Sequence, residues 1–149
     1  MAEDIEIELR AGDACARIVP ACGASVTGLW VDEVPVLRPA SGHAENGPFS
    51  VSSIVLAPFS NRVSRPFSWQ GSPVALARNL ETEAYPIHGD AFQRCWAVLE
   101  LSPRRTVLHL AQGAFGPLRY EATLTYAIFP GSFRSELSLL SRSEQPMPF

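Results

Sequence analysis

The sequence of 149 residues is long enough for one domain that buries about 70% of the surface its unfolded chain would expose. Hydrophobic residues make up 46% and charged residues 18%, which is a globular composition and excludes an intrinsically disordered chain. The net charge is −3, and the 12 basic residues are all arginines without a long basic run, which argues against nucleic acid or an anionic membrane as a partner.

The N-terminal segment is acidic where a signal peptide would be basic. No apolar run approaches the ~18 residues of a membrane-spanning helix, so we expect a cytoplasmic protein. The three cysteines have no C-x-x-C spacing and no second histidine nearby. We therefore expect reduced thiols, no metal and no cofactor.

Short alternating segments, separated by turn residues, follow one another along most of the chain. Residues 5–9 and 15–19 alternate in polarity around the turn sequence of residues 10–14, which predicts a hairpin. A second hairpin is predicted for residues 25–31 and 34–39 around an Asp-Glu turn. After a long central segment, four more strands are predicted at residues 96–101, 106–112, 120–129 and 133–141.

No segment has apolar residues at helical spacing over three turns, so an all-β fold is predicted. Strands of this length and spacing are typical of an antiparallel sandwich or barrel. The absence of a low-complexity linker favours a single domain over residues 1–149. Five residues are predicted to lie in the core: Trp30, Leu56, Val98, Leu110 and Leu124.

The central segment, residues 56–96, is rich in turns and carries polar and aromatic side chains. Arg62 follows an apolar run, and its guanidinium could donate to hydroxyls or to a carboxylate. His88 lies on a turn beside a glycine and could donate to a ligand or titrate near neutrality. Taken alone, each residue more often has a structural role, with the arginine bonding backbone carbonyls and the histidine satisfied within the fold.

The combination of these groups changes the interpretation. Arg62, Asn79, His88, Asp90 and several aromatic residues lie close together in the sequence. An apolar pocket with a few convergent polar groups is typical of a small-molecule site. Aromatic rings can stack on the C–H faces of sugars, although core packing is their commoner role.

The central sequence APFSNRVSRPFSWQGSPVALARN, followed by IHGDAFQRCW, resembles the aldose 1-epimerase (galactose mutarotase) family. The order and spacing of the Asn-Arg pair, Phe, Gly, Leu, Asn and His-Gly agree with the family pattern. The early segment CGASVTGLWVDEVPVLRP and the late segment RSELSLLSRSEQPMPF are similar to the family as well. The resemblance covers essentially the whole chain.

The resemblance implies a galactose mutarotase-like antiparallel β-sandwich that acts on a free aldose such as galactose or glucose. In that family a carboxylate takes the proton of the anomeric hydroxyl and a histidine protonates the ring oxygen. The ring opens and closes again to the other anomer, by acid–base catalysis without metal or cofactor.

By this resemblance, Arg62 matches the family's sugar-binding arginine, Asn61 is its neighbour, and His88 matches the first of two active-site histidines. Together with Asp90, these residues are the sugar-binding candidates. His88 is also the candidate for a supporting catalytic acid. The resemblance places the family's second histidine and its catalytic glutamate beyond Phe149, so we expect the chain to correspond to the N-terminal half of the family fold.

Three functions stay open at this point: an epimerase-like enzyme, a catalytically silent carbohydrate-binding module or inactive fragment, and a small barrel for an apolar ligand. The expected small-molecule partner is a monosaccharide, and the sequence does not say whether it is phosphorylated. A sandwich that is cut short would expose apolar faces and open edges. We therefore expect self-association or pairing with a missing C-terminal half.

Overall fold

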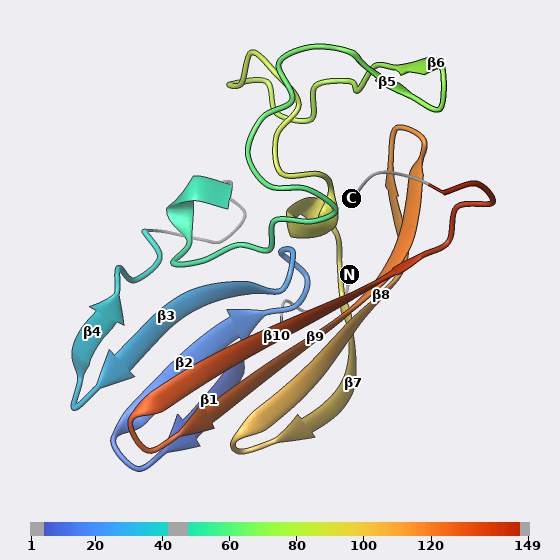
Figure 1. Ribbon diagram of the computed structural model, residues 1–149. Coiled ribbons are helices and arrows are strands. Elements are labelled where there is room, and N and C mark those ends of the chain that lie inside the picture. Colours follow the sequence, from blue (N-terminus) through green and yellow to red (C-terminus); the bar gives the residue numbers. More distant parts are fainter. Residues whose placement is uncertain (1–4, 42–47, 147–149) are drawn as a thin grey trace.

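The computed structural model describes residues 5–41 and 48–146, and nearly all regular structure in them is β-strand (Figure 1). The first sheet has four antiparallel strands in the order β1-β2-β3-β4. Its strands are β1 Ile7–Ala11, β2 Ala14–Val19, β3 Ser25–Val31 and β4 Val34–Leu37. The predicted N-terminal hairpins are confirmed.

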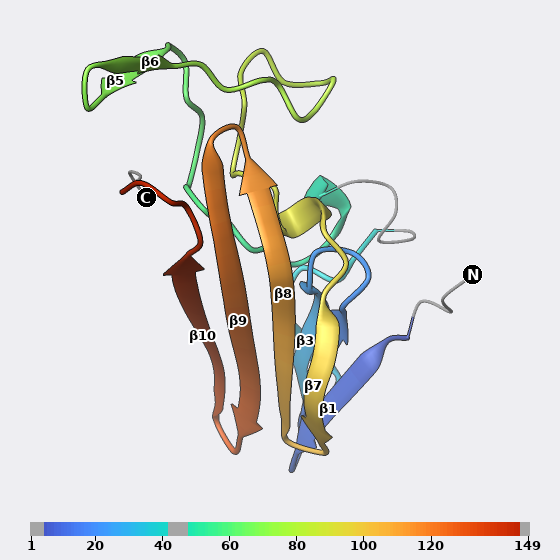
Figure 2. The ribbon, with the colours of Figure 1, turned by 90° about the vertical axis from the view of Figure 1, so that its right-hand side faces the viewer.

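The second sheet also has four antiparallel strands, in the order β10-β9-β8-β7. Its strands are β7 Ala97–Ser102, β8 Arg105–Phe115, β9 Leu118–Phe129 and β10 Ser132–Ser141. Figure 2 shows β10 and β7 at the two edges of this sheet. In both sheets, each strand pairs with its neighbours in the sequence, so each sheet is a meander.

Two short strands in the central segment were not predicted: β5 Phe67–Trp69 and β6 Ser72–Val74 form a separate hairpin. The only other elements among the described residues are single 3₁₀ turns at Pro48–Ser50 and Ala91–Gln93. None of the helices in the described part of the chain has the length and apolar character needed to cross a membrane.

The two sheets pack face to face, and the core lies between them. Alternate residues of β1 and β9 point inward, as the period of two along a strand requires. Leu9 and Ile18 of the first sheet and Leu108 of the second are fully buried. Burial of each such side chain contributes about 1.5–3 kcal/mol to stability. The all-β sandwich prediction is therefore confirmed.

The sandwich is joined along one side and open along the other. The backbone N–H of Arg10 in β1 donates to the Pro103 carbonyl, in the turn after β7, at 2.8 Å. On the opposite side an apolar groove of about 310 Å³ runs between the sheets, and we call it the β4–β10 groove. It is lined by Val26, Leu37, Ser53, Ile54, Val55, Leu56, Leu124, Tyr126, Phe133, Ser135 and Leu137.

Two of the five core predictions are confirmed and three are wrong. Leu110 and Leu124 are 4% and 2% exposed. Leu56 is 40% exposed. It lies between the buried Val55 and Ala57, and its side chain lines the β4–β10 groove and not the core. Val98 is 41% exposed, because it lies on the edge strand β7, whose residues are all exposed.

Trp30, the fifth predicted core residue, is only half-buried and does not lie between the sheets. It pairs with Cys15 in the first sheet, and its ring centroid lies 5.3 Å from the guanidinium of Arg17, the exposed residue on the outer face of β2. A Cβ at Gly28 would fall within 1.8 Å of its ring, so the glycine makes room for the indole. The prediction failed because the residue's face on the strand, rather than its hydrophobicity, decides its burial.

Candidate functional site

The loops of residues 56–96 lie over one end of the sandwich and carry the predicted site residues (Figure 1). Residues 61–63 and 86–88 run antiparallel there, with Arg62 paired to Ile87. The His88 N–H donates to the Asn61 carbonyl, and the Val63 N–H donates to the Pro86 carbonyl, each at 3.0 Å. This paired loop brings together Asn61, Arg62 and His88, three of the candidate sugar-binding residues.

The backbone of the paired loop is strained at two non-glycine residues. Asn61 has φ 61° and His88 has φ 62°, in the left-handed region that costs about 1–3 kcal/mol outside glycine. The side chain of Asn79 holds the backbone around His88 in place. Its Nδ2 donates to the carbonyls of Ile87 and Gly89 at 2.8 and 2.7 Å, and its Oδ1 accepts from the Ile87 N–H at 2.9 Å. Asn79 is therefore a clamp on the His88 turn.

Gly89 is required by the close approach of a neighbouring segment. It has φ 68°, and a Cβ built on it would lie 2.2 Å from the carbonyl oxygen of Ala57. The same carbonyl accepts a hydrogen bond from the Ala91 N–H at 3.2 Å. Any side chain at position 89 would push the His88 turn away from residue 57.

His88 is held as a neutral donor. The Asn61 N–H donates to Nδ1 of His88 at 2.9 Å, so this nitrogen is the unprotonated one and Nε2 carries the proton. Burial lowers the pKa of His88, and the neighbouring Arg62 guanidinium lowers it further, while Glu83 acts in the opposite direction. At neutral pH the ring therefore presents an N–H at Nε2.

Arg62 is fixed by a carboxylate that sequence reasoning did not assign to it. Its Nε and Nη2 donate to the two carboxylate oxygens of Glu83, both at 2.7 Å. This bond to Arg62 lowers the pKa of Glu83. Two donor positions of the predicted fork are thus used by Glu83, and Nη1 donates one of its two N–H groups to Asn61 Oδ1 at 3.4 Å.

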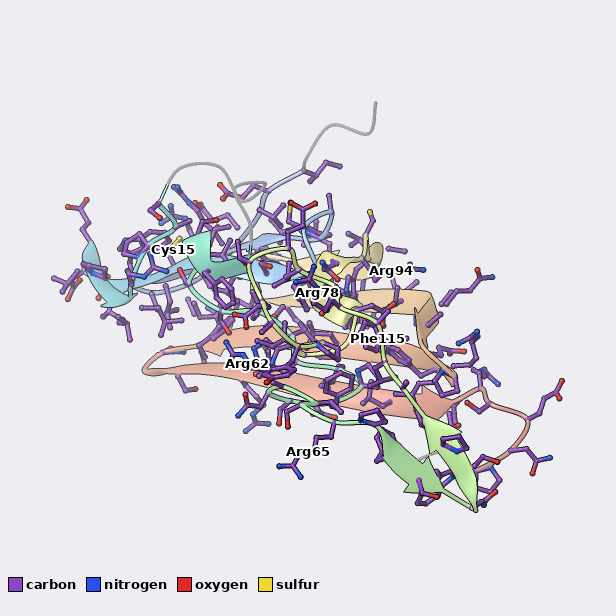
Figure 3. The ribbon with its side chains drawn as sticks, turned by 90° about the horizontal axis from the view of Figure 1, so that it is seen from above. Cys15, Arg62, Arg65, Arg78, Arg94 and Phe115 are labelled. Carbon is purple, nitrogen blue, oxygen red and sulfur yellow. The ribbon has the colours of Figure 1, made fainter. Side chains whose placement is uncertain are left out.

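Nothing in the sequence signals the pairing of Arg62 with Glu83. The two residues lie 21 positions apart in turn-rich sequence without a period that relates them. Figure 3 shows Arg62 among the loops at the end of the sandwich, whereas Arg65 projects away from the molecule. The two neighbouring arginines therefore differ in environment.

Asp90 lies two residues after His88 in the chain but faces the core. It is 6% exposed, and its Oδ1 accepts a hydrogen bond from the Tyr120 hydroxyl at 2.6 Å. Its Oδ2 accepts from the Ala114 N–H at 3.1 Å and lies 3.6 Å from Nε of Arg94. Burial, together with the bond to Asp90, raises the pKa of Tyr120. Asp90 anchors the His88 turn to the second sheet, and its predicted contact with sugar stays a prediction.

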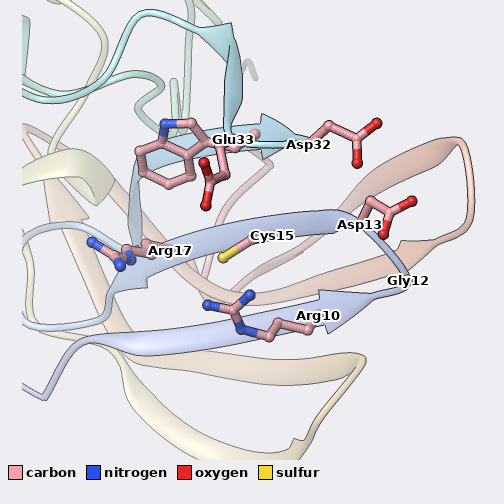
Figure 4. A pocket seen from close by; sticks show the side chains of 8 residues that line it. Arg10, Gly12, Asp13, Cys15, Arg17, Asp32 and Glu33 are labelled. Carbon is pink, nitrogen blue, oxygen red and sulfur yellow. The ribbon is translucent and has the colours of Figure 1, made fainter.

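A separate hollow of about 600 Å³ lies on the outer face of the first sheet (Figure 4). The Arg17 guanidinium lies 5.3 Å from the Trp30 ring centroid and also bonds to Glu8, as does Arg10. None of the predicted site residues lines this hollow. Its lining residues are Arg10, Gly12, Asp13, Cys15, Arg17, Trp30, Asp32 and Glu33.

Comparisons with known proteins agree on one family. A family model described as aldose 1-epimerase matches residues 6–149. The protein YphB of Escherichia coli (strain K12), whose name states no activity, is 29% identical over 128 residues, which are 85% of this chain and 43% of YphB.

Solved structures are similar as well. The crystal structure of an Escherichia coli K12 protein described as a candidate aldose 1-epimerase has a TM-score of 0.91 and 26% identity, covering 97% of this chain and 49% of the other. A galactose mutarotase-like protein from Clostridium acetobutylicum has a TM-score of 0.74 and 19% identity, covering 93% and 46%. The chain thus spans about half the length of the proteins it matches.

Proposed function

The chain belongs to the aldose 1-epimerase family, and we propose that its paired loop forms the sugar-contacting part of a site for a free aldose such as galactose or glucose. The observation that carries this proposal is the fixed state of His88. Asn61 holds the ring with its proton on Nε2, and Arg62 lies beside it in the same pair of segments. Donors held in advance lose little conformational entropy when a ligand binds.

The roles of the individual residues follow from their remaining donors. Nε2 of His88 donates to a sugar oxygen, and Nη1 of Arg62 donates to a neighbouring hydroxyl. Glu83 keeps the guanidinium in position, and Asn79 with Gly89 keeps the turn in position. Neutral hydrogen bonds contribute about 0.5–1.5 kcal/mol each and charge-assisted ones about 1.5–3 kcal/mol. We therefore expect dissociation constants in the millimolar range.

In the family reaction, a base removes the proton of the anomeric hydroxyl and an acid protonates the ring oxygen, so that the ring opens and closes on its other face. His88, with its proton on Nε2, is the group in the paired loop that can serve the ring oxygen or a hydroxyl. Glu83 is committed to Arg62, and no carboxylate of this loop is assigned as the base. This favours binding with little rate enhancement by these residues alone, as in a carbohydrate-binding module.

The proposal is tested by titration calorimetry of the 149-residue protein with galactose and with glucose. We expect millimolar binding that is lost in Arg62→Ala and in His88→Ala. Arg65→Ala is the matched control, because Arg65 projects away from the molecule (Figure 3), and it should bind as the unchanged protein does. Absence of binding to the unchanged protein, or equal loss in the Arg65 variant, would overturn the proposal.

Polarimetry on the same proteins separates the two functions. Mutarotation well above the background rate, lost in His88→Ala but kept in Arg65→Ala, would identify an enzyme whose base lies within these residues. Binding without such a rate would identify a carbohydrate-binding module. A positioned acid or base typically contributes about 10²–10⁴-fold, so the two outcomes are well separated.

A further inference from the structure

The single 3₁₀ turn Ala91–Gln93 is held firmly by the core of the protein. The indole N–H of Trp96 donates to the Ala91 carbonyl at 3.0 Å, and Trp96 is 2% exposed. A Cβ built on Gly23 would lie 2.0 Å from the carbonyl oxygen of Phe92, so the glycine lets the turn between β2 and β3 contact this backbone directly. The 3₁₀ turn is therefore a fixed support for the residues around it.

Two side chains of this turn contact the His88 region. The buried Phe92 ring lies edge-to-face against the His88 ring, with centroids 6.2 Å apart and an interplanar angle of 82°. The amide of Gln93 bonds to Asn79 at both of its ends. Its Nε2 donates to the Asn79 carbonyl at 2.8 Å, and its Oε1 accepts from Nδ2 of Asn79 at 3.4 Å. The Gln93 amide is thus engaged within the protein.

The position of Asn79 depends on this contact. Residues 75–79 form no helix or strand, and among the described residues the Gln93 side chain makes the one hydrogen bond to their backbone. The Asn79 side chain in turn bonds to the backbone on both sides of His88. A residue at left-handed φ, as His88 is, keeps that conformation only where its surroundings fix it. Support from the core therefore reaches the His88 turn through Gln93 and Asn79.

We propose that Gln93 is a positioning residue of the site: acting through Asn79, it holds the His88 turn in the arrangement in which Nε2 presents its proton to a ligand. Its role in sugar binding rests on the proposed function, whereas the state of the His88 ring can be measured without sugar. Without Gln93, Asn79 loses its link to the core and the strained His88 backbone relaxes. The bond from the Asn61 N–H to Nδ1 of His88 is then lost, and the ring no longer keeps a single tautomer.

Gln93 does not act through burial, because it is exposed. Gln93→Ala therefore leaves no cavity and should keep the fold. Gln93→Glu keeps the size of the side chain and its acceptor oxygen, but a carboxylate cannot donate to the Asn79 carbonyl. A role in packing alone would leave Gln93→Glu like the unchanged protein, whereas the proposed role predicts that both variants release Asn79.

Long-range ¹H–¹⁵N NMR of the histidine rings, recorded without sugar at several pH values, tests the proposal. It shows which ring nitrogen carries the proton, and the signals of His88 are those that disappear in His88→Gln. In the unchanged protein we expect the proton of His88 on Nε2 and a pKa below 6.5. Both Gln93 variants should give a mixture of tautomers and a pKa closer to 6.5, because the released ring is less buried. The signals of His109, on β8, should not change.

Gln112→Ala is the matched control, because Gln112 is exposed and its side chain makes no hydrogen bond to the described residues. Its His88 signals should equal those of the unchanged protein. Titration calorimetry should show sugar dissociation constants raised about two- to tenfold in the Gln93 variants, as expected for one neutral hydrogen bond.

An unchanged tautomer and pKa of His88 in Gln93→Ala would overturn the proposal, even if sugar binds. A change in Gln93→Ala that is absent in Gln93→Glu would overturn it as well, because the donated bond would then have no effect. If the unchanged protein binds no sugar but His88 responds to both Gln93 variants, the proposed function fails and the hold of Gln93 on His88 is supported.

Discussion

The hydrogen bond between Tyr120 and Asp90 should be among the most stabilising side-chain bonds of the described residues, because both partners are buried and one is a carboxylate. The hydroxyl lies 2.6 Å from Oδ1 of Asp90, and the residues are 1% and 6% exposed. Tyr120→Phe removes the hydroxyl and keeps the ring. Loss of a bond to a charged group costs about 1.5–3 kcal/mol, so we expect the free energy of unfolding to fall by about 2 kcal/mol.

Tyr126→Phe is the matched control. The Tyr126 hydroxyl is also buried, but it donates to a neutral acceptor, the Ala24 carbonyl, at 3.0 Å. Its removal should cost about 1 kcal/mol. Urea unfolding measures both values, and an unchanged dependence on urea concentration shows that the unfolded state is not altered. In a thermal melt, the Tyr120 variant should lose about 4–8 °C.

A double-variant cycle isolates the bond itself. Asp90→Asn combined with Tyr120→Phe should cost less than the sum of the single changes, with a coupling of about 1 kcal/mol or more. If Tyr120→Phe and Tyr126→Phe lower the free energy of unfolding equally, or if the effects of Asp90→Asn and Tyr120→Phe are additive, the bond from Tyr120 does not stabilise the buried carboxylate as argued.

Three further outcomes are expected. The pKa of His88 in the folded protein is lowered from 6.5, so the folded protein binds fewer protons than the unfolded chain. The contribution of His88 to the free energy of unfolding should therefore be full above pH 6.5 and decrease as the pH falls below that value. His88→Gln should flatten this pH dependence, and urea titrations at several pH values measure it. Gly89→Ala should cost more than about 3 kcal/mol or prevent folding, since its Cβ would meet the Ala57 carbonyl, and circular dichroism melts measure this. Leu108→Ala should cost about 2–5 kcal/mol, whereas Val98→Ala on exposed β7 should change the unfolding free energy by less than about 0.5 kcal/mol.

Much of the fold could be predicted because it depends on local alternation. Strands such as β1 and β9 follow the period-two pattern, and turns between strands are marked by residues such as Asp32 and Glu33, both at positive φ. Burial was less predictable. Leu56 and Val98 are as hydrophobic as Leu124, and what separates them is their position at an open side or an edge, which the sequence pattern does not encode.

It could be predicted from the sequence that the candidate residues lie near one another, but not which hydrogen bonds they make. The turn residues around His88 indicated a loop that presents an imidazole, and the family pattern pointed to Arg62. The partner of Arg62 is Glu83, which lies 21 positions later in a loop without periodicity. No rule of residue spacing could therefore predict this pair. Likewise, Asp90 lies only two residues after His88, yet its side chain points to Tyr120, because the backbone turns at Gly89, which has φ 68°.

The meander order of the two sheets has a consequence for the path of folding. Each strand pair within a main sheet joins neighbours in the sequence, so every hairpin closes only a short loop. The contacts between the sheets are different, because Tyr126 in β9 must reach the Ala24 carbonyl 102 residues away. The entropic cost of closing a loop grows with the length of the loop, although slowly. Proteins with many non-local contacts therefore fold more slowly. We therefore expect the two meanders to form independently and their docking to be the late, rate-limiting step of folding.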